Sequence, residues 1–142
     1  MTIRSVIKGS GSALPRRAVA NAEMAAMVDT TDEWIVERTG IRNRYIAGEG
    51  ETTATLATEA ARNALQMAGI DAADVGLIVL ATATPDQTFP ASATKVQAAL
   101  GIDDCVAFDV HAVCTGFLYA LTVADSMLRS GTARHADRKS VV

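Results

Sequence analysis

Apolar residues recur every three or four positions over residues 56–68, the spacing that places them on one face of an α-helix. A glycine follows at once, as expected where a helix ends in a left-handed residue. Shorter helices are predicted over residues 21–28, with an asparagine N-cap, and from Thr31 or Asp32 to Gly40. A further helix is expected over residues 90–101, beginning at Pro90 and ending at Gly101.

Short apolar runs rich in β-branched residues separate these helices. Residues 75–83 have the composition of a central strand covered on both faces, and residues 105–110 predict a second buried strand. A first strand is expected over residues 3–10, and the glycine-containing residues 43–51 predict a loop. The alternation of strands and helices indicates an α/β domain.

Composition and charge narrow the classes of function. The chain has 142 residues, enough for one compact domain, and 49% of them are hydrophobic. A formal net charge of −3 argues against a nucleic-acid-binding protein, because such proteins gather basic residues to neutralise phosphates. The longest apolar runs are too short to cross a membrane, and the first residues lack the pattern of a secretion signal. We therefore expect a cytoplasmic protein.

The cysteine count excludes two further kinds of site. Cys105 and Cys114 are the only cysteines, so a disulfide framework is not expected in a reducing compartment. Two cysteines without clustered histidines also do not provide a tetrahedral zinc site, and we expect no metal. Each cysteine therefore needs its own explanation.

Cys114 directly follows an apolar strand and stands at the entrance of a helix predicted over residues 114–128, which is apolar nearly all round. The amides and dipole of a helix N-terminus stabilise a thiolate, so a cysteine at this position is a candidate nucleophile. The same amides are candidate donors to an oxyanion, and Gly116 is expected to allow close backbone packing.

Structural explanations compete with this chemistry. A buried cysteine is most often a small core residue, which is the preferred interpretation of Cys105 and remains open for Cys114. An activated cysteine usually has a histidine within hydrogen-bond reach. Strand alternation is expected to point His111 away from Cys114, and His135 follows the helix at its far end.

Two longer motifs are specific. The run DTTDEWIVERTGIRNRYIA over residues 29–47 and the run FDVHAVCTGFLYAL over residues 108–121 resemble β-ketoacyl-acyl carrier protein synthase III. The resemblance implies the thiolase fold, an αβαβα arrangement of two similar halves. This chain is expected to be the first, N-terminal half, with a mixed central sheet flanked by helices.

The resemblance also implies a reaction. In this family a short acyl-CoA such as acetyl-CoA acylates the cysteine, and malonyl-acyl carrier protein then decarboxylates and attacks the thioester. This condensation initiates type II fatty acid synthesis. The implied partners are acyl-CoA, malonyl-acyl carrier protein and a second copy in a homodimer, with no cofactor beyond the acyl-CoA substrate.

Site residues carry over by motif match. Cys114 takes the place of the nucleophile, and Trp34 resembles the tryptophan that stacks on the adenine of coenzyme A. Arg38, with Thr30 and Thr39, resembles the polar set around the nucleotide and pantetheine arm. Arg38 is four residues after Trp34 and thus on the same helix face. A partly buried helix residue that closes the core is the competing interpretation of Trp34.

Phe89 resembles the phenylalanine that the family's dimer inserts into the neighbouring acyl pocket. An ordinary loop anchor is the competing interpretation, and the length or branching of the primer stays open.

The pattern changes after Ala136. We expect residues 1–136 to form the thiolase-like domain and residues 137–142, DRKSVV, to be a divergent polar tail of a truncated chain. The tail is expected to be too polar and short for the next buried strand. The histidine and asparagine that assist the family's cysteine belong to its second half, so the chain alone is predicted to condense poorly or not at all. The apolar surfaces of residues 75–83 and of the Cys114 helix are expected to lack their covering layer.

Two alternatives remain. One is a non-catalytic fragment that binds CoA or dimerises, and the other is a related condensing enzyme with another primer.

Overall fold

The computed structural model describes residues 4–140 of the chain. These residues form two compact units, one of residues 14–51 and one of residues 4–13 together with residues 52–140. Each unit has its own β-sheet. No helix in residues 4–140 is long and apolar enough to cross a membrane.

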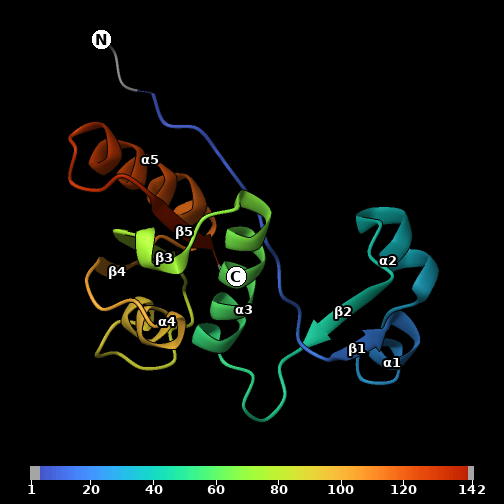
Figure 1. Ribbon diagram of the computed structural model, residues 1–142. Helices are drawn as coiled ribbons and strands as arrows, with labels where there is room; N and C mark the ends of the chain where they lie inside the picture. The colour runs from blue at the N-terminus through green and yellow to red at the C-terminus, as the bar shows by residue number, and fades with distance from the viewer. Residues whose placement is uncertain (1–3, 141–142) are drawn as a thin grey trace. The chain divides into compact units, whose positions relative to one another are not determined.

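The larger unit is built around a three-stranded parallel sheet (Figure 1). Its strands lie in the order β4 (Val106–Val110), β3 (Leu77–Ala81) and β5 (Ala136–Ser140), and Leu77 is aligned with the first residue of each neighbouring strand. The α/β architecture is thus confirmed. We expected a mixed sheet, whereas the described strands of this sheet are all parallel.

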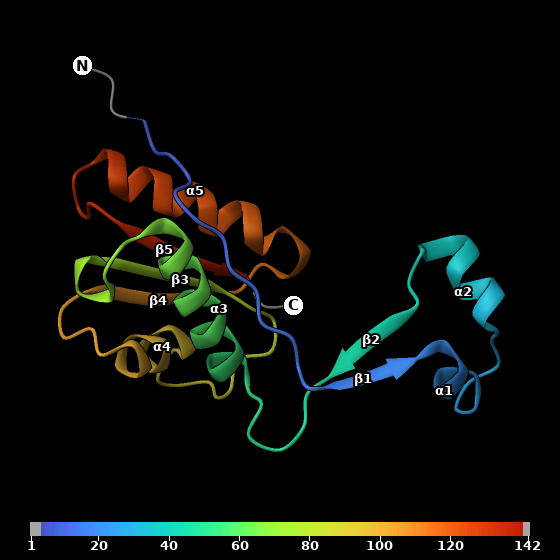
Figure 2. The same cartoon turned by 45° about the vertical axis from the view of Figure 1, so that its right-hand side comes forward.

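Helices cover both faces of the sheet (Figure 2). The helices α3 (Thr53–Ala68) and α4 (Ser92–Leu100) lie on one face, and α5 (Gly116–Arg129) lies on the other. β4 and β5 flank β3 on opposite sides, so the crossovers that contain α4 and α5 run in opposite directions. Because crossovers keep one hand, such a reversal places the two helices on opposite faces.

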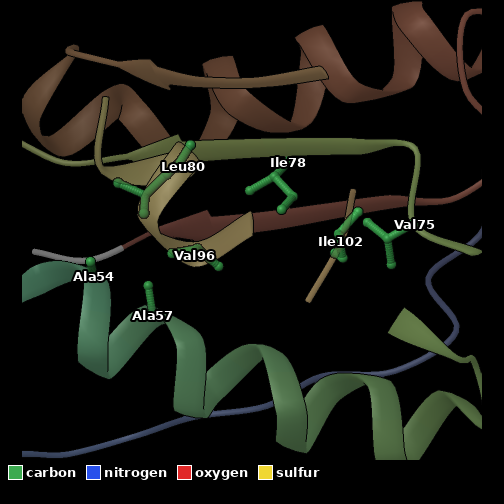
Figure 3. Close-up of a cluster of buried hydrophobic side chains, with 8 residues drawn as sticks. Ala54, Ala57, Val75, Ile78, Leu80, Val96 and Ile102 are labelled. Carbon is green, nitrogen blue, oxygen red and sulfur yellow. The ribbon is translucent and has the colours of Figure 1, made fainter. Parts of the chain in front are cut away.

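The core follows the alternation of side chains along β3, all five of which are buried. Ile78 and Leu80 pack with Ala57 and Val96 toward α3 and α4, as Figure 3 shows. Leu77, Val79 and Ala81 instead pack against α5. The predicted central strand is thereby confirmed. The prediction that its apolar surface lacks a covering layer is wrong, because helices of this unit cover both of its faces.

The ends of α3 and α4 have identifiable caps. Thr52 and Thr55 form a capping box at the start of α3, and Gly69 ends it with a φ of 64°. The carboxylate of Asp109 accepts the backbone N–H groups of Ser92 and Ala93 at 2.7 and 2.8 Å. The predicted start of α4 at Pro90 is therefore two residues early, because the β4 carboxylate caps the helix at Ser92.

Two strand predictions in this unit need correction. β4 is half-buried rather than buried, because only β3 pairs with it within the described residues. The tail residues after Ala136 were expected not to form a strand, yet β5 extends through them to Ser140. β5 pairs with β3 through backbone N–H and C=O groups, and these groups are available whether the side chains are polar or apolar. A short 3₁₀ helix, η1 (Ala72–Asp74), precedes β3.

The strand expected over residues 3–10 is also wrong for its described part, since residues 4–10 have no regular secondary structure. This extended segment packs closely on α3. A Cβ atom built on Gly9 would lie 2.5 Å from the Ala64 carbonyl oxygen, and one built on Gly11 would lie 2.2 Å from that of Ala60. Both glycines are required by close approach rather than by a turn. Residue 3 lies outside the described part of the chain.

The smaller unit is an antiparallel pair of strands with two helices. β1 (Arg17–Ala20) pairs with β2 (Asn43–Ile46), and α1 (Asn21–Ala25) and α2 (Asp32–Thr39) connect them. The helix over residues 32–39 is confirmed, with Thr31 as its N-cap. The loop predicted over residues 43–51 is wrong in its first part, which is β2.

Asn21 is the first residue of α1 rather than its N-cap, and its side chain has another use. It is 1% exposed, and its amide nitrogen donates to Asp32 Oδ1 at 2.7 Å and to the Ile41 carbonyl oxygen at 2.8 Å. Asn21 thus joins the start of α1 to the start and the far end of α2, which fixes the hairpin formed by the two helices.

Glu51 joins the outer ends of the strand pair. Its carboxylate accepts the backbone N–H groups of Gly48 at 2.9 Å and Arg16 at 3.0 Å. These bonds, first that of Gly48 and then that of Arg16, lower the pKa of the Glu51 carboxyl below its ordinary value, with a smaller contribution from the Arg16 charge.

The lowered pKa gives a prediction for pH dependence. A carboxyl whose folded pKa is depressed stabilises the fold above its unfolded pKa of about 4.3, and this stabilisation is lost as pH falls through the folded value. We expect the Arg16 and Gly48 amides to exchange faster with solvent as pH falls from 5 to about 3, after correction for intrinsic rates. Glu51→Gln is expected to remove this pH dependence, and Glu49→Gln to retain it. Equal protection in wild type and Glu51→Gln at pH 5 would contradict the assignment.

Candidate active site

Cys114 lies on a tight turn between the sheet and α5. The turn is a 3₁₀ helix, η2 (Val113–Thr115), and α5 begins directly after it at Gly116. The helix predicted to begin at Cys114 thus begins two residues later. Cys114 is solvent-exposed, which removes the interpretation of this residue as a small core side chain.

Val113 carries backbone strain beside the thiol. Its φ is 46°, and it is the only described residue other than glycine with a positive φ. A β-branched residue rarely adopts this conformation, because its Cβ substituents crowd the backbone. The Val113 side chain is 68% exposed, so burial of its methyl groups does not account for the residue type. Strained backbone of this kind is frequent at functional sites.

Gly116 anchors the turn to the sheet. A Cβ atom built on Gly116 would lie 3.1 Å from Ala81 Cβ at the end of β3. The expectation of close packing at Gly116 is confirmed, and the contact is with the central strand. The Thr115 N–H donates to the Ala112 carbonyl at 3.1 Å, and the Gly116 N–H donates to that of Val113. These two amides are therefore engaged within the turn.

The turn lies at the carboxyl ends of the parallel strands. The Thr82 N–H, one residue past β3, donates to the carbonyl of Val110, the last residue of β4, at 3.2 Å. In open α/β sheets this edge is where ligands bind and catalytic side chains gather. An exposed cysteine here is accessible to a substrate.

Neither histidine of the chain is bonded to Cys114 in the described structure. His111 is exposed and makes no hydrogen bond or ion pair within residues 4–140. His135 Nδ1 lies 3.2 Å from the Asp74 carbonyl oxygen, and the His135 carbonyl accepts from Gly76 just before β3. His135 is thus at the amino ends of the strands, which confirms its prediction as distant from the thiol.

Cys105 has a different environment from Cys114. It is half-buried and packs against the core cluster between the sheet and α3 and α4. Burial, and to a lesser extent the neighbouring Asp104 charge, raise the pKa of the Cys105 thiol. Because the thiolate is the nucleophile, this environment disfavours reaction and supports the interpretation as a core residue.

Trp34 and Arg38 form a contiguous surface on α2 in the smaller unit. The Arg38 guanidinium carbon lies 4.6 Å from the centroid of the Trp34 ring, a cation–π distance, and Trp34 is 52% exposed. The prediction that they share a helix face is confirmed. The exposure of Trp34 argues against its alternative role in closing the core.

The two threonines of the predicted set differ. Thr39 is already satisfied, since its hydroxyl donates to the Ile35 carbonyl at 2.7 Å and accepts from the Ile41 N–H at 3.1 Å. The Thr30 hydroxyl oxygen is buried and has no hydrogen-bond partner in the described structure. A buried hydroxyl without a partner is costly and needs an explanation, such as a polar group of a ligand.

Phe89 is 86% exposed, in the loop that leads from β3 to α4. A loop anchor would bury its ring, so the alternative interpretation is wrong for the described residues. The outer face of α5 is also exposed, at Phe117, Leu118, Tyr119 and Leu121. This confirms that the Cys114 helix presents apolar surface.

Sequence patterns missed three features of these sites. The strain at Val113 leaves no signal, because the residue is a typical member of an apolar run. The buried Asn21 Oδ1 and Arg44 Nη1 also lack partners in the described structure. Arg44 could have been found because it belongs to the specific motif of residues 29–47, whereas Asn21 lies outside that motif.

The strain at Val113 can be measured by a substitution. Val113→Gly should relieve a cost of about 1–3 kcal/mol and add about 0.5–1 kcal/mol of chain entropy, so the free energy of unfolding is expected to rise by about 1 kcal/mol. Val106→Gly, at a partly exposed valine of β4, should lower it by about 1 kcal/mol. Urea unfolding of both variants measures the difference. A loss at Val113 as large as that at Val106 would exclude strain.

Comparison with known proteins gives one consistent result. The family model of 3-oxoacyl-[acyl-carrier-protein] synthase III matches residues 108–136, which include the Cys114 turn and α5. The β-ketoacyl-[acyl-carrier-protein] synthase III of Rhizorhabdus wittichii is 77% identical over 133 residues, covering 94% of this chain and 42% of that protein. The chain thus spans about two fifths of the length of the curated relatives it matches.

Solved structures agree. The 3-oxoacyl-[acyl-carrier-protein] synthase III of Aquifex aeolicus is 46% identical with a TM-score of 0.85, over 92% of this chain and 42% of that one. OleA of Xanthomonas campestris, determined with lauric acid and lauroyl-CoA, is 25% identical with a TM-score of 0.83, over 96% of this chain and 43% of that one. In sequence and fold, the chain belongs to the thiolase-fold family of β-ketoacyl-[acyl-carrier-protein] synthase III and corresponds to the N-terminal part of its members.

Proposed function

We propose that Cys114 accepts an acyl group from a short acyl-CoA, in a protein that carries out the initiating condensation of type II fatty acid synthesis. The observation that carries this proposal is the exposed Cys114 on a strained turn at the carboxyl edge of the sheet. A thiol at this position is accessible to a thioester carbonyl, whereas the half-buried Cys105 is not suited to attack.

Acyl transfer would take place in two bond changes. The Cys114 thiolate attacks the thioester carbonyl, and the intermediate then expels the CoA thiolate, which takes up a proton. The acyl group is left as a thioester on Cys114. Charge on the carbonyl oxygen needs hydrogen-bond donors, and the N–H groups at the start of α5 are nearby candidates. Those of Thr115 and Gly116 would have to leave their bonds within the turn.

Condensation is the second step. Malonyl-acyl carrier protein loses CO₂, its carbanion attacks the acyl-Cys114 thioester, and the products are 3-oxoacyl-acyl carrier protein and the free Cys114 thiolate. The family resemblance assigns a histidine and an asparagine to this step, and neither His111 nor His135 is bonded to Cys114. We propose that residues 4–140 support acyl transfer better than condensation.

The smaller unit supplies a candidate CoA-binding surface. The exposed face of the Trp34 indole suits a purine, and the Arg38 guanidinium above it suits a phosphate. The unpartnered Thr30 hydroxyl is suited to a polar group of the pantetheine arm or nucleotide. Thr39 has its hydrogen bonds satisfied locally, so we give it a supporting role at the end of α2.

A homodimer is the proposed state of the complete protein. β4 has an unpaired edge within the described sheet, and such edges are usually covered by another strand. The exposed Phe89 ring would gain a contact in the same assembly. The cytoplasmic location expected from the sequence remains a prediction.

The alternative is a non-catalytic chain that binds CoA or dimerises. The observation in its favour is that neither histidine of the chain bonds to the Cys114 thiol in the described structure. A related condensing enzyme with a longer or branched primer is also compatible with the Cys114 turn. Acylation of Cys114 separates the catalytic and the non-catalytic functions.

Acylation is tested by intact-mass spectrometry after incubation with acetyl-CoA. We expect one acetyl adduct on the native chain and on Cys105→Ser, and none on Cys114→Ser, because only Cys114 is exposed. An adduct that persists in Cys114→Ser, or the lack of an adduct on a folded native sample, would contradict the proposed nucleophile and favour the non-catalytic alternative.

CoA binding is tested by calorimetric titration. Arg38→Ala should weaken binding about three- to tenfold, the equivalent of a cation–π or charge-assisted contact at an exposed site. Arg129→Ala is a matched control, since the two side chains are 54% and 55% exposed and each lies beside a carboxylate. Equal affinities for all three proteins would exclude the Trp34–Arg38 surface as the binding site.

A further inference from the structure

The loop between β3 and α4, residues 82–91, is fixed at several points along its length. At its start, the Thr82 hydroxyl accepts the Thr84 N–H at 3.0 Å. The Thr53 hydroxyl of α3 then donates to the Thr84 carbonyl at 2.7 Å. At its end, the Ser92 N–H is held by Asp109. The loop is thus bonded to α3, and the first residue of α4 that follows it is bonded to β4.

Asp86 is the centre of this network. Its side chain is 9% exposed, and its carboxylate accepts the Thr52 hydroxyl at 3.0 Å and the Ala54 N–H at 3.2 Å. Lys95 Nζ of α4 lies 3.5 Å from the same carboxylate. One side chain of the loop therefore joins the start of α3 to α4.

The backbone of Asp86 is also held. Its N–H donates to the Ser92 hydroxyl at 3.3 Å, and Ser92 is fully buried at the start of α4. A buried carboxylate with hydrogen bonds from two helices is expensive to displace, because its partners would lose their bonds together. Residue 86 is thus fixed by both its side chain and its backbone.

Phe89 lies three residues beyond this fixed point. Between them, the Gln87 side-chain amide donates to the Phe89 carbonyl at 3.0 Å, which closes the tip of the loop. Phe89 is 86% exposed and belongs to neither apolar core cluster of residues 4–140. Burial of the ring therefore does not hold Phe89, which leaves the hydrogen bonds of the loop, with those of Asp86 at their centre.

We propose that Asp86 is a positioning residue, which holds the β3–α4 loop in a preformed conformation and thereby presents Phe89. The proposal rests on the proposed homodimer and on the role that the family resemblance implies for Phe89, insertion into the acyl pocket of the neighbouring copy. A preformed loop avoids the entropy of ordering an exposed aromatic side chain when it meets its partner. Loss of the Asp86 carboxylate then impairs the position of Phe89 without removing any group that touches the thioester.

The test is backbone ¹⁵N relaxation of the 142-residue chain. We expect order parameters of about 0.85 at Gln87, Thr88 and Phe89 in the native chain, and below about 0.6 in Asp86→Ala, with β3 unchanged. Asp86→Asn keeps an oxygen for the Ala54 N–H and should give intermediate values, which provides a readout if Asp86→Ala does not fold. The matched control is Asp71→Ala, because the Asp71 carboxylate accepts the Ala73 N–H of η1 at 3.0 Å, a bond outside the loop.

A mobile loop in the native chain, or an ordered loop in both Asp86 variants, would overturn the proposal. A fall in order parameters throughout the unit would show a general structural role and would also overturn it. These readouts do not depend on Cys114 chemistry, so they remain decisive if no acetyl adduct forms.

Where the adduct forms, the ratio of acylation rates with acetyl-CoA and hexanoyl-CoA gives a second readout. Asp86→Ala and Phe89→Ala should shift this ratio in the same direction, about threefold or more, and the double variant should shift it no further. Additive shifts would show that Asp86 acts independently of Phe89.

Discussion

Every side chain of β3 is buried, and its two faces lie under different helices. This burial on both sides is the constraint from which the rest of the larger unit follows. It requires helices on opposite faces of the sheet. With crossovers of one hand, this places β4 and β5 on opposite sides of β3. It also fixes the end of the strand at Ala81, where the close contact with Gly116 sets the start of α5. The position of Cys114 is therefore a consequence of how the central strand is packed.

The carboxyl edge of the sheet combines strain with rigid support. Val113 adopts an unfavourable backbone conformation, whereas Asp86 and Asp109 accept backbone N–H groups at the starts of α3 and α4. A strained turn persists only when its surroundings determine it, and the packed strands and capped helices supply that framework. Reactive and supporting residues thus come from different elements that meet at one edge. The Trp34–Arg38 surface belongs to the smaller unit and is organised within α2 alone.

Local patterns predicted what local physics determines. The helical spacing of residues 56–68, the apolar run of β3 and the pairing of Trp34 with Arg38 all depend on neighbours within a few positions. Predictions failed where a distant partner decides the structure. β1 and β2 are mostly exposed strands that stabilise each other, and β5 pairs with β3 through its backbone despite the polar residues DRKS. The strain at Val113 arises from the junction of two elements, which an apolar sequence does not record.

The contact of the first segment with α3 defines more than the position of that segment. Gly9 and Gly11 are two residues apart, which is the side-chain period of an extended chain, so both meet the same helix. The space beside them does not admit a Cβ atom. A slip of the segment by one residue would bring Ser10 into that space, and a slip by two would replace one glycine by a larger residue at one contact. The two glycines therefore permit a single register of the segment on α3, and the side chains of Asn63 and Met67 bond to the segment at Ser12 and Ser10 in that register.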